Sequence, residues 1–138
     1  MRFEFIVYGK PVPKGRPRFF VRKGFVSTYT PQETKKAENT VGKSAKLAGV
    51  KCIGKGVPVA IKMKFVMPIP KSFSKKKRED AISGKLKCTT KPDIDNLAKI
   101  IDGLNKIAWE DDSQIVSATF EKVYGEEPRT EFVIEEIE

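Results

Sequence analysis

The chain has 138 residues, of which 39% are hydrophobic; this suits one folded domain with a single core better than a disordered chain. The formal charge is +9 with no histidine, which excludes a Ser-His-Asp triad, an H-E-x-x-H zinc site and any histidine general base. Two cysteines, Cys52 and Cys88, are too few for a disulfide framework or a cysteine-rich zinc site.

The first elements along the chain are predicted to be short strands around a stiff loop. In residues 2–8, Phe3, Phe5 and Val7 alternate with Arg2, Glu4 and Ile6, and this alternation predicts a strand. Residues 9–17, GKPVPKGRP, are punctuated by Pro and Gly and indicate a loop. Residues 18–21 and 25–29 flank Lys23-Gly24 and predict a hairpin.

The N-terminal segment also bears on location. Residues 1–10, MRFEFIVYGK, are typical of a strand and not of a signal peptide. No apolar run approaches the roughly 18–20 residues that a membrane span needs. We therefore expect a cytoplasmic protein without a membrane partner.

The middle of the chain predicts a helix, a strand and a basic loop. Thr30 can cap a helix over residues 31–48, with Pro31 in its first position, Glu33 completing a capping box and Gly49 as its stop. Residues 57–67 alternate and predict a strand. Residues 68–91 lack periodicity, so we expect a mobile basic loop with at most a short helix, and loops of this length are usually functional.

The last third predicts a helix and two strands. Asp93 or Asp95 should cap a helix that runs to about residue 107. Residues 114–124 and 130–137 predict two strands, antiparallel about residues 125–128. The whole chain is thus expected to be a single α+β domain, with a mixed sheet of about four to six strands and two main helices.

Two pairs of aspartates frame the predicted helix. Asp93 and Asp95 stand before it, and Asp111 and Asp112 follow it. Clustered carboxylates repel one another unless a hard cation such as Mg²⁺ or Mn²⁺ neutralises them. If the strand from Gln114 runs back beside the helix, three or four carboxylates would converge on the cation. A calcium loop beginning at Asp93 is excluded, because Ala98 and Leu104 stand where an EF-hand needs Gly and Glu.

The predicted helix would carry a polar stripe. With Asp95 taken as zero, Lys99, Asp102 and Lys106 fall within about 40° of it at about 100° per residue. The opposite side carries the apolar residues Leu97, Ile100, Ile101, Leu104 and Ala108. The stripe alone can equally be i,i+4 ion pairing, Asp95–Lys99 and Asp102–Lys106, worth about 0.3–0.5 kcal/mol each. Asp93 lies before the helix and has no such ion-pair partner, which favours a functional role for these aspartates.

A family resemblance rests on these residues. Residues 91–105, KPDIDNLAKIIDGLN, and residues 111–115, DDSQI, resemble the RusA family of Holliday-junction resolvases, which is common in phages and prophages. Residues 9–18, GKPVPKGRPR, are similar to the opening of that family. The resemblance covers most of the chain, from the first predicted strand onward.

The resemblance implies a homodimeric, Mg²⁺-dependent endonuclease that resolves four-way DNA junctions by paired nicks during recombination and repair. It implies that Asp93, Asp95 and Asp112 hold the metal and that Lys99 is the functional lysine. It favours Asp112 over Asp111, which we keep as a further candidate ligand. Asn96 and Asp102 also match the motif, without an assigned role. A bound Mg²⁺ would activate a water and polarise the scissile phosphate.

The charge distribution points to nucleic acid independently. Residues 1–91 hold 23 Lys and Arg against 5 Asp and Glu, and residues 92–138 hold 4 against 13. Such a split suggests a polyanion-binding part beside a cation-binding part. The candidate DNA-binding residues are Lys10, Lys14, Arg16, Arg18, Lys75, Lys76, Lys77 and Arg78.

Three phenylalanines lie among these bases. Phe19, Phe20 and Phe73 could stack on bases at a branch point, although packing within the protein is the commoner use of such residues. Two other functions stay open from sequence. The chain could be a non-catalytic nucleic-acid-binding protein whose acids serve solubility, or a nuclease for flaps, forks or RNA.

Overall fold

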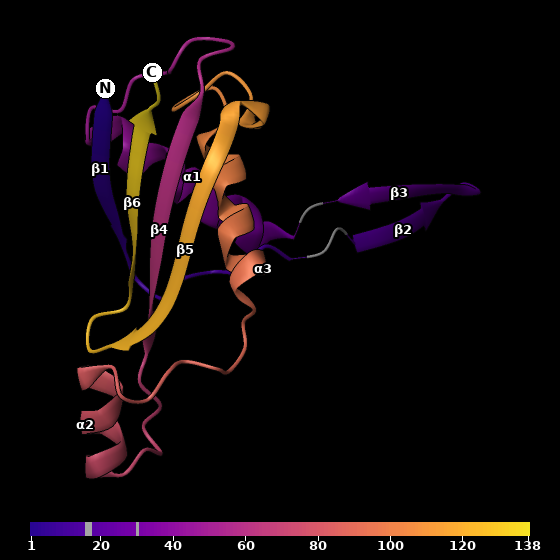
Figure 1. Cartoon of the computed structure of the whole chain (residues 1–138). Helices are drawn as coiled ribbons and strands as arrows, with labels where there is room; N and C mark the ends of the chain where they lie inside the picture. The colour runs from indigo at the N-terminus through magenta and orange to yellow at the C-terminus, as the bar shows by residue number, and fades with distance from the viewer. Residues whose placement is uncertain (16–17, 30) are drawn as a thin grey trace.

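The structure, a computed structural model, describes residues 1–15, 18–29 and 31–138. The strands are β1 (Arg2–Tyr8), β2 (Arg18–Arg22), β3 (Phe25–Tyr29), β4 (Val59–Pro68), β5 (Ile115–Gly125) and β6 (Arg129–Glu136). The main sheet has the order β1-β6-β4-β5, and β2 and β3 form a separate hairpin (Figure 1). Because β4 pairs in parallel with β5 and antiparallel with β6, the sheet is mixed, as expected for an α+β domain.

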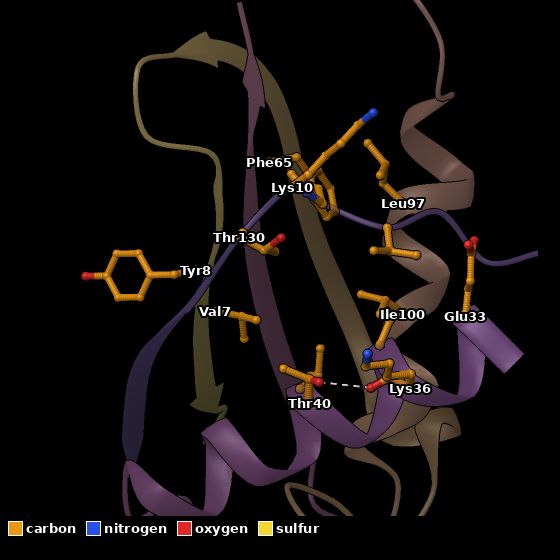
Figure 2. Close-up of a pocket in the computed structure, with 15 residues that line it drawn as sticks. Val7, Tyr8, Lys10, Glu33, Lys36, Thr40, Phe65, Leu97, Ile100 and Thr130 are labelled. Atoms are coloured by element: carbon orange, nitrogen blue, oxygen red, sulfur yellow. Dashed lines mark hydrogen bonds between the residues drawn. The ribbon is translucent and has the colours of Figure 1, made fainter.

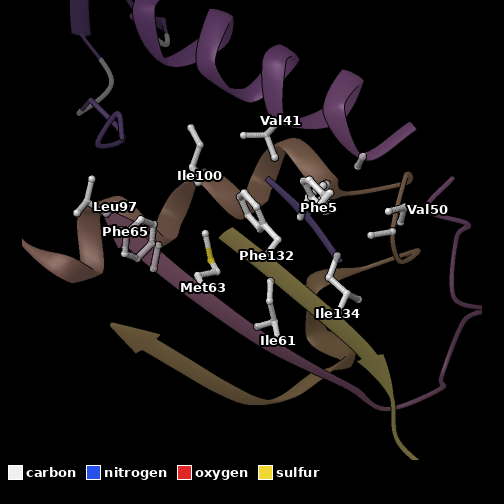
Figure 3. Packing of buried hydrophobic residues seen from close by; sticks show 14 of the residues in the cluster. Phe5, Val41, Val50, Ile61, Met63, Phe65, Leu97, Ile100, Phe132 and Ile134 are labelled. Atoms are coloured by element: carbon white, nitrogen blue, oxygen red, sulfur yellow. The ribbon is translucent and has the colours of Figure 1, made fainter. Parts of the chain in front are cut away.

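The helices are α1 (Gln32–Leu47), α2 (Lys75–Ser83) and α3 (Ile94–Ala98), with 3₁₀ helices η1 (Lys99–Leu104) and η2 (Asp112–Gln114). Helix α1 and the α3–η1 segment pack against one face of the sheet (Figure 3). In this core Phe65 of β4 and Phe132 of β6 meet Leu97, Ile100 and Val41 from the two helical segments. None of the helices in the described ranges is long and apolar enough to cross a bilayer.

Strand β4 takes the centre of the sheet. Its inward residues are buried, and Val66 and Met67 near its end are buried as well. Its other face is more open, with Lys62 exposed. The last two strands do run in opposite directions, as predicted, but they do not pair with each other, because β4 lies between them.

The other predicted strands and the first helix are confirmed, except that Pro31 occupies the N-cap position and not the first helical position. The hairpin turns at Lys23 and Gly24, whose φ angles of 49° and 79° are both positive. Helix α1 begins after Pro31 and ends before Gly49, whose φ of 81° lies in the left-handed region that glycine favours. Thr30 lies outside the described residues, as does the capping box predicted to begin there.

The basic segment 68–91 contains the nine-residue helix α2, which matches the short helix that the sequence analysis allowed within this loop. Ser74 caps α2 by accepting a hydrogen bond of 3.2 Å from the Lys77 backbone N–H. Phe73 packs edge-on against Tyr124 at 5.7 Å between ring centroids, and the Lys77 ammonium lies 4.3 Å from its ring. Phe73 therefore packs within the protein.

The central helix differs from the prediction in its second half. Only residues 94–98 are α-helical, and residues 99–104 form a 3₁₀ helix. The change coincides with a close approach to α1, since a Cβ on Gly103 would lie 2.5 Å from the Glu38 carbonyl oxygen. The tighter winding displaces the polar stripe, and Lys106 pairs with Glu110 at 3.4 Å. The apolar side survives, with Leu97, Ile100 and Leu104 buried.

Candidate active site

Asp93 and Asp95 stand exposed at the start of α3. Asp93 occupies the N-cap position, yet its side chain makes no capping hydrogen bond. Its carboxylate instead accepts a hydrogen bond of 2.9 Å from Lys91 Nζ. That hydrogen bond, followed by the positive charge of Lys91, lowers the pKa of Asp93 below its ordinary value. Asp93 is therefore a carboxylate at neutral pH, with oxygens that the helix does not use.

Lys122 fixes the chain just before these aspartates. Its Nζ on β5 donates hydrogen bonds to the Thr90 carbonyl oxygen at 2.7 Å and to the Pro92 carbonyl oxygen at 2.9 Å. The two bonds tie the segment that leads into Asp93 to the sheet. Sequence reasoning missed this role, because a lysine in an alternating strand is usually a solvated surface charge.

Lys99 lies about one turn beyond Asp95. It is exposed, and its Nζ donates a hydrogen bond of 3.3 Å to Asn96 Oδ1. Asn96 is thereby linked to the lysine that the sequence motif singles out. The start of α3 thus gathers two acids, an amide and an ammonium group within about one and a half turns.

Asp111 and Asp112 lie at the other end of the α3–η1 segment. That segment has 11 residues from Ile94 to Leu104, a length of about 20 Å. Lys122, near Asp93, is likewise seven residues along β5 from Ile115, about 23 Å. The predicted convergence of all the aspartates is therefore wrong within one chain. Strand β5 does run back beside the helix (Figure 1), but Asp111 and Asp112 precede it and stay at its far end.

The same conclusion follows from the side chains. Across residues 1–15, 18–29 and 31–138, no three His, Cys, Asp or Glu side chains lie close enough together to share a metal ion. Asp93 and Asp95 form one exposed acidic pair, and Asp111 and Asp112 form another.

Gln114 holds the second pair in place. Its buried side-chain amide donates hydrogen bonds to the carbonyl oxygens of Gly54 at 2.7 Å and Val57 at 3.0 Å. Its Oε1 accepts from the backbone N–H groups of Glu110 and Asp111, both at 3.0 Å. The glutamine of the DDSQI stretch is thus a positioning residue. Its place in the DDSQI stretch could have indicated this role, but the sequence analysis assigned no role to Gln114.

The region around Asp111 is also hydrogen-bonded. The Ser113 hydroxyl donates to Asp111 Oδ2, and this bond is the main cause that lowers the pKa of Asp111. Asp112 is exposed and begins η2. Both carboxylates therefore face outward from a rigid turn.

Lys14 contacts acidic side chains of its own chain, and its role in DNA binding stays a prediction. Its Nζ hydrogen-bonds Asp102 and lies 3.7 Å from Glu38 Oε1, while its backbone N–H donates to the Asn96 carbonyl oxygen at 3.0 Å. The side chain is only 27% exposed. The hydrogen bond with Asp102 raises the pKa of Lys14. Lys14 thus anchors the N-terminal loop to α3 and η1.

Comparison with known proteins identifies the family. Residues 8–135 match the family model described as "Endodeoxyribonuclease RusA". The chain belongs to the RusA family. It is also 43% identical to the Bacillus subtilis (strain 168) protein named "Uncharacterized protein YqaN" over 137 residues, which cover 97% of this chain and 96% of that protein.

The RusA match includes both acidic pairs and Lys99. Of the residues predicted to bind DNA, Lys10 is exposed, and Lys75, Lys76, Lys77 and Arg78 are exposed on α2. Arg16 lies outside the described residues. Arg18 begins β2, and its side chain is not described. The exposed bases of α2 lie near the end of the sheet where β5 finishes (Figure 1), the end nearer Asp93.

The chain also has a pocket of about 370 Å³ between the sheet and its two helical segments (Figure 2). Its wall is mainly apolar, with Val7, Phe65, Leu97 and Ile100 among the lining residues. Lys10, Glu33 and Lys36 also line it. None of the aspartates described above lines this pocket, so both acidic pairs lie on the open surface instead.

Proposed function

We propose that this protein is a metal-dependent endonuclease that nicks branched DNA, with the four-way junction as its substrate. The match to the RusA endodeoxyribonuclease family over residues 8–135 carries this proposal. The exposed acids and lysine at the start of α3 support it, because they offer groups suited to a metal ion and a phosphate. The exposed bases supply attraction for DNA.

The group at the start of α3 fits Mg²⁺ or Mn²⁺. Mg²⁺ usually keeps several waters and takes one or two protein carboxylates together with substrate phosphates. Asp93 and Asp95 provide two carboxylates that do not cap their helix. The ion, when bound there, would activate water and polarise a phosphate oxygen. Lys99 would stabilise negative charge that develops on the phosphate.

The separation between Asp112 and Asp93 leads to a proposal that involves a second copy of the chain. If Asp112 belongs to the same metal site, it cannot reach Asp93 within one chain. We propose a homodimer in which Asp112 of one protomer lies beside Asp93 and Asp95 of its partner. A two-fold dimer would also present two sites to a junction that has two-fold symmetry, which suits paired nicks.

The test is cleavage of a synthetic four-way junction with and without Mg²⁺. Wild-type protein should nick it only with the metal, whereas Asp93→Asn and Lys99→Ala should bind the junction without nicking it. Glu126→Gln, which removes one exposed negative charge from the turn that follows β5, is the matched control and should cut like wild type.

Other functions would give different results. Strong, salt-dependent binding that ignores Mg²⁺, with no cutting, would indicate a non-catalytic nucleic-acid-binding protein. Preferential cutting of flaps, forks or RNA in a substrate panel would replace the junction as substrate. Mn²⁺ or Mg²⁺ should also raise the melting temperature of the wild-type protein, and less so that of Asp93→Asn.

A further inference from the structure

The β2–β3 hairpin extends away from the main sheet (Figure 1). Its strands pair in a continuous antiparallel register, from Arg18 opposite Tyr29 to Arg22 opposite Phe25. The turn has positive φ at both Lys23 and Gly24, the geometry that matches the twist of a two-residue hairpin. An isolated two-stranded hairpin is only marginally stable in water. We therefore expect a binding partner to contact this hairpin and stabilise it.

The outer part of this arm is apolar and exposed. Val21 is 71% exposed, Phe25 is 75% exposed and Val26 is 68% exposed. Val21 and Val26 are directly paired across the strands, so they lie on the same face of the ribbon. Phe25 pairs with Arg22 and precedes Val26, so it lies on the opposite face. The outer part of the arm thus exposes large apolar side chains on both faces, and such exposed groups mark an interaction site.

The charge of the arm selects the partner. The hairpin, residues 18–29, carries Arg18, Arg22 and Lys23 and no acid. Three bases without a single acid on so short an arm favour a polyanion. They also disfavour contact between two such arms, because like charges would face one another. Within a family of endodeoxyribonucleases, the polyanion of this kind is DNA.

We propose that the β2–β3 hairpin is an arm that places Val21, Phe25 and Val26 against base faces at the branch point of DNA. This inference rests on the proposed function and adds the source of its structure selectivity. Base faces are stacked and hidden within a continuous duplex, whereas a branch point can present them. Apolar wedges and stacked aromatic rings are the side chains that occupy such places. The bases of the arm would hold the neighbouring phosphates.

The first experiment compares junction and duplex binding. Phe25→Ser and the double variant Val21→Ser, Val26→Ser should each raise the dissociation constant for the four-way junction at least about fivefold. This is the change in affinity expected when the stacking of one base is lost. Binding of a linear duplex of the same sequence should not change, since phosphate contacts remain. Leu47→Ser is the matched control, because Leu47 is 90% exposed at the end of α1 and away from the arm.

A second experiment keeps an aromatic side chain on the arm. A photo-crosslinking phenylalanine analogue in place of Phe25 should attach to nucleotides at the branch point. A junction carrying 2-aminopurine beside the branch should also change its fluorescence with wild type, and less with Phe25→Ser.

Several outcomes would overturn the inference. The first is that both variants bind the junction as tightly as wild type, and the second is that they lose duplex and junction binding equally. The third is that Phe25 crosslinks to a second copy of the chain. The fourth is that Phe25 is needed to bind anionic vesicles while junction binding stays intact. Failure of the proposed function looks different, because wild type itself would then not cut the junction. If wild type cuts and the hairpin variants bind and cut like it, the arm inference alone fails.

Discussion

At the scale of single residues, Lys14 connects three parts of the molecule. It belongs to the N-terminal loop, its ammonium group bonds Asp102 on η1, and it also lies near Glu38 on α1. A charged pair that is largely shielded from water contributes more than one on the open surface. Lys14 therefore stabilises the arrangement on which the start of α3 depends.

A double-mutant cycle measures that contribution. Lys14→Met and Asp102→Asn should each lower the free energy of unfolding by about 1–2 kcal/mol, because each leaves a charged partner without its bond. The double variant should lose less than the sum, with a coupling near 1 kcal/mol by urea denaturation. The control cycle uses Lys106 and Glu110, an exposed i,i+4 pair expected to couple by only about 0.3–0.5 kcal/mol. Equal couplings in both cycles would contradict the anchoring role.

The same cycle has a defined pH dependence. The pKa of Lys14 is raised in the folded protein, chiefly by its hydrogen bond with Asp102. Its stabilisation is therefore fully present below the ordinary lysine pKa, about 10.4, and is lost as the pH rises through the higher folded value. Couplings measured at pH 7 and pH 9 should agree.

Gln114 offers a second test at this scale. In Gln114→Glu, one carboxylate oxygen can still accept from the N–H groups of Glu110 and Asp111, but the other would face two carbonyl oxygens. We expect a loss of more than about 2 kcal/mol in unfolding free energy at pH 8. Burial would raise the pKa of the new carboxyl group, so the loss should be smaller at pH 5.

The control for this substitution is Gln32→Glu. Gln32 is exposed in the first turn of α1, where a negative charge is tolerated or favourable. Its unfolding free energy should stay within about 0.5 kcal/mol of wild type. A Gln114→Glu protein as stable as this control would show that the amide does not hold the Asp111–Asp112 turn.

At the scale of elements, the contact between α1 and η1 is set by glycine. A Cβ on Gly103 would lie 2.5 Å from the Glu38 carbonyl oxygen and 2.9 Å from its Cα, so the clash is with backbone that cannot rotate away. Gly42 faces the same contact from α1, where a Cβ would lie 3.1 Å from the Gly103 carbonyl oxygen. The two elements therefore approach with almost no side-chain spacing.

Gly103→Ala should separate them. We expect the free energy of unfolding to fall by about 1–3 kcal/mol, because the added methyl group must push one element away from the other. Gly54→Ala is the control, since a Cβ there meets nothing within 4 Å. It should change stability by less than about 0.5 kcal/mol in the same thermal or urea melts. A tolerated Gly103→Ala would mean that η1 can shift without cost.

The elements also indicate what the sequence could predict. Local patterns were sufficient for β1, the hairpin, α1 and β4, since alternation, glycine turns and a helix stop act within a few residues. Long-range choices were not accessible. The insertion of β4 between β5 and β6 depends on pairing between strands far apart in the sequence, and the 3₁₀ winding at Lys99 coincides with the distant contact between Gly103 and Glu38.

In the candidate site, too, local positions could be predicted from the sequence and long-range distances could not. The motif located Asp93, Asp95 and Lys99 as neighbours, because their spacing lies within about two helical turns. It could not place Asp112 relative to them, since that distance depends on where β5 begins. Nor could charge alone separate Lys14, which bonds Asp102, from Lys10, which is exposed.

At the scale of the whole molecule, the two acidic pairs lie at opposite ends of the α3–η1 segment. The exposed bases of α2 lie nearer to Asp93 than to Asp112, as judged by their place along β5 (Figure 1). One chain thus presents an incomplete acidic site at each end. A two-fold dimer joins such halves reciprocally, since each contact between two protomers occurs twice.

Mixing two inactive variants tests this arrangement directly. If Asp112 acts on its partner's Asp93 and Asp95, a mixed dimer of Asp93→Asn and Asp112→Asn contains one site with all its aspartates intact. About half of the dimers should be mixed after random exchange, and they should nick one strand of a four-way junction without the paired second cut. Asp93→Asn mixed with Asp95→Asn is the control and should stay inactive, because both variants damage the same half. Inactive mixtures despite proven subunit exchange would show that Asp112 does not complete its partner's site, and a protein that stays monomeric in sedimentation would rule out the dimer.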